Sequence, residues 1–347
     1  MRPHRDTALT AGRVMRSLPN STYIFLFVFV VFLFLIPNFG SAGNLSALLQ
    51  QASILSLLSA AMALSIMARE IDLSVGSIVS FTGIVIALGL RAELGELLSI
   101  FLGLAAATVF GIVNGFIVVK MKVVPFIATF GMMGIGQGLA NILSNKRAMY
   151  LTTEDGPPLP LIAFLQKDIV SIPLGDGSLF SISMIVVITA FVLGLLIFFF
   201  RRTVLHAYVY AIGNNPEAAK LCNIRVDFWG TAVLAMVGFL SGIAGFLMLL
   251  RVNSAQPTAG DGLEFQAVVA AVLGGNLLSG GKGSIPGAIL GALVVYMVRN
   301  GLTLLGVHSN YVMVVLGMVL ILGMVMNDLA SRGFKRTRKE EHADAAS

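Results

Sequence analysis

Charged residues are scarce in this chain. Lys, Arg, Asp and Glu make up 12% of its 347 residues, whereas a soluble domain carries about 25%. Apolar residues make up 57% and the mean hydropathy is +0.91. These values exclude a soluble enzyme, a disordered regulator and a secreted disulfide scaffold, and they indicate a polytopic membrane protein.

Cysteine and histidine are also rare. The single cysteine, Cys222, cannot form an intrachain disulfide, and the four histidines lack the spacing of a zinc site. The sequence contains no Gly-x-Ser-x-Gly motif. We therefore predict no metal site, no catalytic residue and no cofactor.

Long uncharged segments run through most of the sequence. A transmembrane helix needs about 20 predominantly apolar residues. We predict an all-α integral membrane protein of about ten transmembrane helices, over 22–37, 45–68, 71–90, 97–119, 124–144, 180–200, 229–250, 264–280, 284–305 and 309–327. A re-entrant segment would give the same pattern over 264–283. The first run could also be a cleaved signal peptide, but its unbroken apolar continuation favours an uncleaved helix.

The positions of the basic residues predict the orientation. With the N-terminus in the cytoplasm, most of the 23 lysines and arginines fall on the cytoplasmic side; six fall outside or at the outer end of a helix, namely Arg91, Lys146, Arg147, Lys167, Arg251 and Arg299. Both termini are then cytoplasmic. The chain divides into a tail (1–21), a transmembrane domain (22–327) and a second tail (328–347).

Two polar loops interrupt the predicted helices. The loop 145–179 lies outside, with a short helix expected at Leu161–Gln166. The loop 201–228 lies inside. The basic C-terminal tail is interpreted as a topology anchor next to the lipid, so we predict no nucleic-acid partner despite a pI near 9.6.

The cytoplasmic loop contains a complete set of helix signals. Asn215 is a good N-cap, Pro216 suits the first helical position, and Glu217 complements the helix dipole. Asn223 can adopt the left-handed conformation that ends a helix. The two-turn helix so predicted is too short to be stable alone, so we expect it to dock on a partner; an ordinary ordered loop is the alternative.

Three motifs resemble those of bacterial ATP-binding-cassette importer permeases, specifically the ribose-type sugar permease group. They are Gly213–Ala219 with Ile224, Ile71–Ser77, and Leu273–Gly275 with Ser279–Ser284. The Gly301–Gly306 stretch is also similar, so the resemblance covers about residues 45–325. Two positions depart from the pattern, because Glu70 and Asn223 stand where glycine is usual.

The resemblance implies a transport subunit that carries a monosaccharide or similar small polyol across the bacterial inner membrane. Its implied partners are cytoplasmic ATPase subunits, a second permease copy or a paralogue, and a periplasmic sugar-binding protein. It also implies coupling to the ATPase through Asn214, Asn215, Pro216, Glu217, Ala218, Ala219, Lys220 and Asn223. ATP hydrolysis belongs to the partner, because the Gly-rich segment 275–284 fails as a phosphate loop: Asn276 replaces its first glycine.

Polar side chains within the predicted helices are candidates for a translocation pathway. They are Glu70, Asp72, Ser74, Asn114, Gln137, Asn141, Asn276 and Asn300. Two other roles compete with this one, because Asp72 could cap the following helix and amides commonly bond between membrane helices. Gly103, Gly111 and Gly115 indicate close helix contacts.

Other functions predict features that can be compared with the sequence. An importer of amino acids or other small polar solutes has a similar build, and only motif details favour sugar. A secondary transporter needs buried ionisable pairs, which most of the predicted helices lack. A membrane enzyme acting on lipid-linked sugars needs clustered carboxylates, whereas the external acidic pairs are scattered: Glu93/Glu96, Glu154/Asp155 and Asp261/Glu264.

Overall fold

The computed structural model describes residues 20–151, 159–173 and 179–308, with isolated positions between 311 and 321. Both predicted tails, apart from residues 20 and 21, and most of the helix expected at 309–327 lie outside these residues. The main helices are α2 (Asn20–Leu35), α3 (Ala42–Met67), α4 (Val75–Arg91), α5 (Glu96–Gly115), α6 (Pro125–Leu143), α8 (Met184–Arg202), α11 (Val226–Val252), α12 (Leu263–Leu273) and α13 (Ile285–Leu304).

Six of the described helices are long and apolar enough to cross a membrane: α3, α5 with its π-helical extension η1 (Phe116–Lys120), α6, α8, α11 and α13. Helices α2, α4 and α12 are apolar but shorter. At 1.5 Å per residue, the 11 residues of α12 extend about 16 Å, roughly half the hydrocarbon core.

The predicted helix over 264–280 is therefore wrong in extent. Helix α12 ends at Leu273, and a loop fills the rest of the segment before α13 begins at Ile285. Gly275, Gly280 and Gly281 have positive φ angles, which break the helix.

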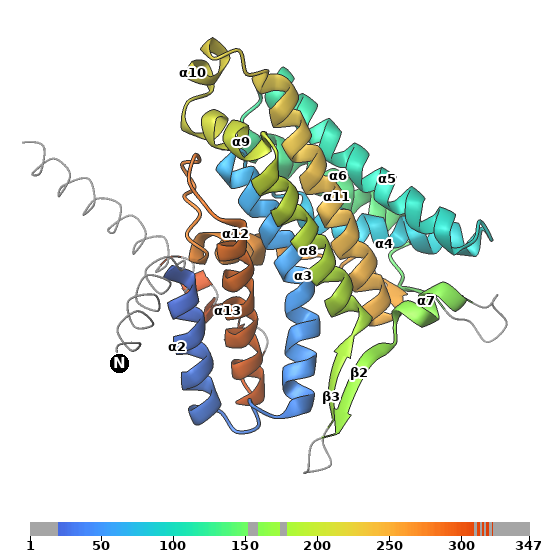
Figure 1. Cartoon of the computed structure of the whole chain (residues 1–347). Coiled ribbons are helices and arrows are strands. Elements are labelled where there is room, and N and C mark those ends of the chain that lie inside the picture. The colour runs from blue at the N-terminus through green and yellow to red at the C-terminus, as the bar shows by residue number, and fades with distance from the viewer. Residues whose placement is uncertain are drawn as a thin grey trace, which may run out of the picture.

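The helices pack in two groups around α3 and α11, which lie side by side (Figure 1). Helices α2, α12 and α13 lie against α3 or one another, and α4 and α5 lie against α11, with α6 beyond α4. The predicted glycine contacts are confirmed: Gly111 lies against Leu234 and Gly238 of α11, and Gly115 lies against Thr231. Small residues here let two helix backbones approach closely.

The fold is not purely helical. Strands β2 (Asp168–Pro173) and β3 (Leu179–Ser183) form an antiparallel hairpin with Ile172 opposite Phe180. Strands β1 (Met149–Tyr150) and β4 (Ser254–Ala255) form a second antiparallel pair. Helix α7 (Pro160–Leu165) occupies the position predicted for a short external helix, and the Glu96 carboxylate accepts bonds from its first amides, at 3.1 Å from Leu161 and 2.6 Å from Ile162.

Two short helices, α9 (Leu205–Asn214) and α10 (Pro216–Leu221), connect α8 to α11. They lie at the opposite end of the molecule from the β2–β3 hairpin (Figure 1). Helix α10 was predicted from its capping residues, whereas α9 was not.

Candidate functional site: the cytoplasmic-loop helix and the motif junction

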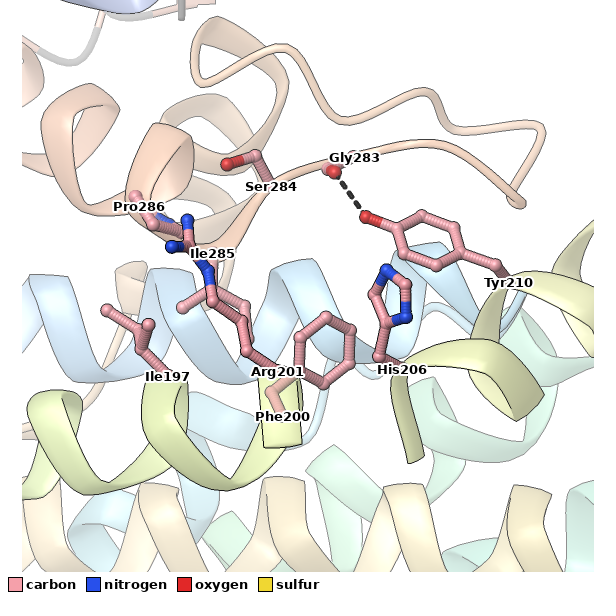
Figure 2. A pocket seen from close by; sticks show the side chains of 9 residues that line it. All are labelled: Ile197, Phe200, Arg201, His206, Tyr210, Gly283, Ser284, Ile285 and Pro286. Carbon is pink, nitrogen blue, oxygen red and sulfur yellow. Dashed lines mark hydrogen bonds between the residues drawn. The ribbon is translucent and has the colours of Figure 1, made fainter. Parts of the chain in front are cut away.

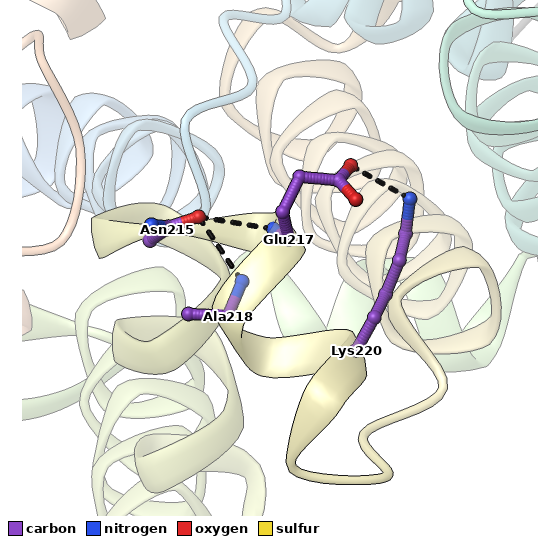
Figure 3. Close-up of polar contacts among 4 residues, drawn as sticks. All are labelled: Asn215, Glu217, Ala218 and Lys220. Atoms are coloured by element: carbon purple, nitrogen blue, oxygen red, sulfur yellow. Dashed lines mark hydrogen bonds and ion pairs between the residues drawn. The ribbon is translucent and has the colours of Figure 1, made fainter.

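Helix α10 is built by its capping residues, as the sequence predicts (Figure 3). The side-chain oxygen of Asn215 accepts hydrogen bonds from the amides of Glu217 and Ala218, both at 3.1 Å. Pro216 is the first helical residue, and Asn223 adopts a left-handed φ of 60° just after the helix. Asn223 therefore ends the helix as expected, although it departs from the glycine of the family pattern.

One ion pair lies on the outer side of this helix. The Lys220 ammonium is 2.9 Å from a Glu217 carboxylate oxygen, one turn apart on the helix (Figure 3). The hydrogen bond and positive charge of Lys220 lower the pKa of Glu217 below its usual range, so this carboxylate is ionised at neutral pH. Both residues remain accessible to a partner.

The surface of α10 also includes an apolar residue that the sequence reasoning missed. The side chain of Leu221 is 90% exposed, beside the exposed thiol of Cys222. Ala219, in contrast, is buried against the rest of the chain. A leucine in a polar loop gives no signal of exposure until the helix phase is known, which is why its position was not predicted.

Asn214 is exposed, but its side chain reaches back to the rest of the chain. Its amide nitrogen donates to the carbonyl oxygen of Tyr210, at 2.8 Å, and to that of Gly281, at 3.1 Å. Tyr210 donates its hydroxyl to the carbonyl oxygen of Gly283, at 2.6 Å. Helix α9 is thereby fastened to the Gly-rich loop 274–284, which we call the glycine loop.

The same loop contacts the end of α3. The amide of Gly281 donates to the carbonyl oxygen of Met67, at 3.0 Å. Gly213 lies against both groups, and Gly280 lies against Arg69. Segments from or next to all three sequence motifs therefore meet at one place, which we call the motif junction: the residues after α3, the end of α9 and the glycine loop.

A buried polar cluster lies at the start of α4. Asp72 accepts bonds at one oxygen from the Ser74 amide (2.8 Å) and hydroxyl (2.6 Å), and at its other oxygen from the Asn114 amide group (3.1 Å). Asn114 also donates to the Ser74 hydroxyl, at 2.8 Å. All three residues are fully buried. The sequence predicts that Asp72 caps α4. In the structure its carboxylate accepts a bond from the amide of Ser74, and Ser74 is the N-cap residue of α4.

The other predicted pathway residues do not converge on this cluster. Glu70 is close to Asp72 in the sequence and is mostly buried. One of its carboxylate oxygens has no hydrogen-bond partner among the described residues. Asn276 closes the glycine loop by accepting from the Ser284 amide at 2.9 Å. Asn300 exchanges two amide bonds with Asn44, at 2.8 and 3.0 Å.

Gln137 and Asn141 lie one turn apart on α6 and are only partly buried. The Gln137 amide donates to the carbonyl oxygen of Pro257 at 2.8 Å, and Asn141 donates to the Gln137 backbone at 2.9 Å. Asn300 is also partly buried, but its side chain is paired with that of Asn44, so among the partly exposed candidate amides Gln137 and Asn141 are the two on α6.

Glu264 corrects a sequence interpretation. It was grouped with scattered external carboxylates, but its side chain is buried and lies directly against Gly76 of α4. The nearby amide of Gly260 donates to the Ser80 hydroxyl at 2.9 Å. The sequence feature that could have indicated this contact is the glycine in the motif 71–77, because a glycine there allows another segment to approach α4 closely.

Within the described ranges, no group of three or more His, Cys, Asp or Glu side chains could hold a metal ion. The arrangement is a set of apolar helices with a small capped helix at one end and interhelical polar contacts inside. It defines the class of the protein as an α-helical membrane protein.

Comparisons with known proteins agree with this class. Residues 44–324 match the family model described as branched-chain amino acid transport system / permease component. The chain is 36% identical over 297 residues to the ribose import permease protein of Escherichia coli, which covers 84% of this chain and 88% of that protein. It is 34% identical over 316 residues to the ribose import permease protein of Bacillus subtilis, covering 90% and 93%.

A further relative is the L-arabinose ABC transporter permease protein of Azospirillum brasilense, 31% identical over 318 residues, covering 91% of this chain and 88% of the relative. No solved structure matches the chain. The chain belongs to the family of ribose-type permease subunits of ATP-binding-cassette importers.

Proposed function

We propose that this chain is the translocation subunit of an importer that carries a monosaccharide across the bacterial inner membrane, driven by ATP hydrolysis in a separate subunit. The names of the relatives support the solute class, because they specify ribose and arabinose. The proposed arrangement has about ten transmembrane helices and both termini in the cytoplasm.

The observation that carries this proposal is the form of the loop 201–228. Helix α10 presents Glu217, Lys220 and Leu221 outward, while its neighbour α9 is bonded to the glycine loop through Tyr210 and Asn214. A two-turn helix held in this way forms a compact projection. We propose that it inserts into a groove of the ATPase, with the other predicted coupling residues shaping or supporting it.

The motif junction gives this contact a route into the membrane domain. A displacement of α10 would move α9, and α9 is hydrogen-bonded to the loop that precedes α13 and packed on the end of α3. We propose that closure of the ATPase pair on ATP moves these helix ends and switches the pore between outward and inward access.

The burial of the polar residues divides the pathway candidates. Asp72, Ser74 and Asn114 are buried and bonded to one another, which favours a role in joining α4 to α5. Gln137 and Asn141 keep partial exposure on α6. We propose that these two amides contact the hydroxyl groups of the sugar.

The remaining partners are also proposals. The periplasmic sugar-binding protein would contact the end that carries the β2–β3 hairpin, because that end is opposite α10 (Figure 1). A second permease copy or a paralogue would complete the pore.

The exposed thiol of Cys222 allows a direct test of the α10 contact. A photo-crosslinker on Cys222 in inside-out membrane vesicles should capture an ATPase that contains a phosphate loop, identified by mass spectrometry. The matched control carries Cys222→Ser and Ser171→Cys, which moves the probe to the exposed β2–β3 hairpin. This control should be labelled in right-side-out vesicles and should capture no ATPase.

Efficient labelling of Cys222 from the cytoplasmic side without capture of an ATPase would contradict the docking role and favour a secondary transporter. Capture of the ATPase from the hairpin position instead would reverse the proposed orientation.

A further inference from the structure

A cavity of about 190 Å³ lies where α8 ends, α9 begins and α13 starts (Figure 2). Its nine lining residues come from these three segments and include Phe200, Arg201, His206 and Ser284. The proposed transport mechanism uses the Tyr210–Gly283 bond at the edge of this cavity but assigns no role to the space itself.

The side-chain charge in the cavity is of one sign. Arg201 lies in the last turn of α8, and none of the lining residues is acidic. Figure 2 shows its side chain extending toward Ile285 and Pro286 at the start of α13. In the part of the chain that the structure describes, the pair Lys220–Glu217 is the one salt bridge, so Arg201 has no carboxylate partner there.

The start of α13 adds partial positive charge, whereas the C-terminal end of α8 brings partial negative charge to the same cavity. The dipole of the 20-residue α13 places partial positive charge at its N-terminus. The Ser284 amide is bonded to Asn276 and the Gly287 amide to the Ser284 hydroxyl, while Pro286 has no N–H. The amide of Ile285, a lining residue, is thus the helix-end donor without a partner among the described residues.

An apolar surface lies on the outward side of α8, around the helix from the side that lines the cavity. Helix α8 carries exposed Phe191, Leu195, Phe198 and Phe199 in the turns that precede Arg201. Such side chains on a membrane-spanning helix suit contact with acyl chains, and a basic residue at the helix end then lies at the level of the lipid headgroups.

We propose that this cavity binds the phosphate group of an anionic phospholipid of the cytoplasmic leaflet. Arg201 binds the phosphate oxygens, the amide end of α13 adds a donor, and the acyl chains lie along α8. The shape of the guanidinium suits this role, because its parallel N–H groups match two oxygens of one phosphate. The assignment of the leaflet rests on the orientation given under the proposed function.

The lipid also has a structural consequence. Tyr210 lines the cavity and bonds Gly283, so a headgroup bound there contacts both sides of the hydrogen bond that fastens α9 to the glycine loop. Binding therefore stabilises the position of α9 relative to α13, next to the motif junction.

The test uses the full-length permease in nanodiscs of phosphatidylcholine, with phosphatidylglycerol titrated in and retained lipid counted by native mass spectrometry. A basic residue near an anionic surface contributes about 1 kcal/mol, so Arg201→Gln should weaken phosphatidylglycerol binding about fivefold. Arg201→Lys should retain part of the affinity. The matched control is Arg202→Gln, which removes the adjacent charge outside the cavity and should change binding less.

Equal losses for Arg201→Gln and Arg202→Gln would overturn the proposal, since they would indicate diffuse charge attraction. If Arg201→Gln does not fold, competition on the wild-type protein decides. Retention of phosphatidylglycerol over phosphatidylcholine and diacylglycerol supports the site. Displacement by equimolar inorganic phosphate overturns the lipid assignment and indicates a site for a soluble anion. Sugar uptake is not measured, so failure here leaves the proposed transport function unaffected.

Discussion

The close contacts of Gly213 allow the motif junction to be tested with a single methyl group. A Cβ atom at position 213 would overlap the carbonyl oxygen of Met67 and come to 2.5 Å from the amide nitrogen of Gly281. Both of these are backbone atoms, so neither can move out of the way as a flexible side chain could. Gly213→Ala must therefore displace α9 from the glycine loop.

The magnitude follows from opposing terms. Replacing glycine by alanine inside a helix favours folding by about 1 kcal/mol. Against this, overpacking costs roughly 1–3 kcal/mol. Displacing α9 also breaks the hydrogen bonds from Asn214 to Gly281 and from Tyr210 to Gly283, each worth about 0.5–1.5 kcal/mol. We expect a net destabilisation of about 1–5 kcal/mol from these ranges.

The matched control is Gly194→Ala, also within a helix, where a Cβ would have no neighbour within 4 Å. The assay measures the apparent melting temperature of the detergent-solubilised permease by fluorescence-detected size exclusion, together with ATP-driven uptake in reconstituted vesicles. Gly213→Ala should lower both, whereas Gly194→Ala should retain both. Equal melting temperatures and equal uptake for the two variants would refute the reasoning that the close contacts at Gly213 hold the junction together.

Three further predictions concern the interior cluster and α10. Asn114→Ala removes the amide that donates to a buried oxygen of Asp72. A double-mutant cycle with Asp72→Ala should give a coupling energy of about 0.6–1.7 kcal/mol, and additive losses of stability in the two single variants would contradict the bond. Glu217→Arg should leave membrane insertion intact but uncouple ATPase activity from transport, so wild-type uptake would argue against docking. Asn215→Ala should destabilise α10 by about 1 kcal/mol through the lost cap, read as increased protease sensitivity of the loop, while Asn215→Ser should restore resistance.

The parts of the fold set by local chemistry could be predicted from sequence. Uncharged runs identified the six long apolar helices that the structure describes. The order Asn215–Pro216–Glu217 identified α10 and where it begins, because an N-cap and a first-turn proline act within one turn. Helix α12 was predicted too long, because glycines in an apolar segment do not reveal which of them adopt positive φ angles.

The site itself depended on contacts distant in sequence. No local signal shows that Asn214 bonds Gly281, or that Asn114 of α5 reaches Asp72. Glu264 was misplaced for the same reason: its position next to Gly76 follows from how α12 packs on α4. Residue type marked these groups as notable, whereas their partners could be identified only from the packed helices.

The bonds at the motif junction have a consequence for engineering permeases. On the α9 side they use the side chains of Tyr210 and Asn214, but on the glycine-loop side they use backbone carbonyl groups of Gly283 and Gly281. A transplanted loop therefore need not match the recipient residue by residue. A chimera that exchanges 201–228 between related permeases should assemble if the incoming loop keeps those two side chains and the small residue at 213, even where its outward surface is adapted to a different ATPase.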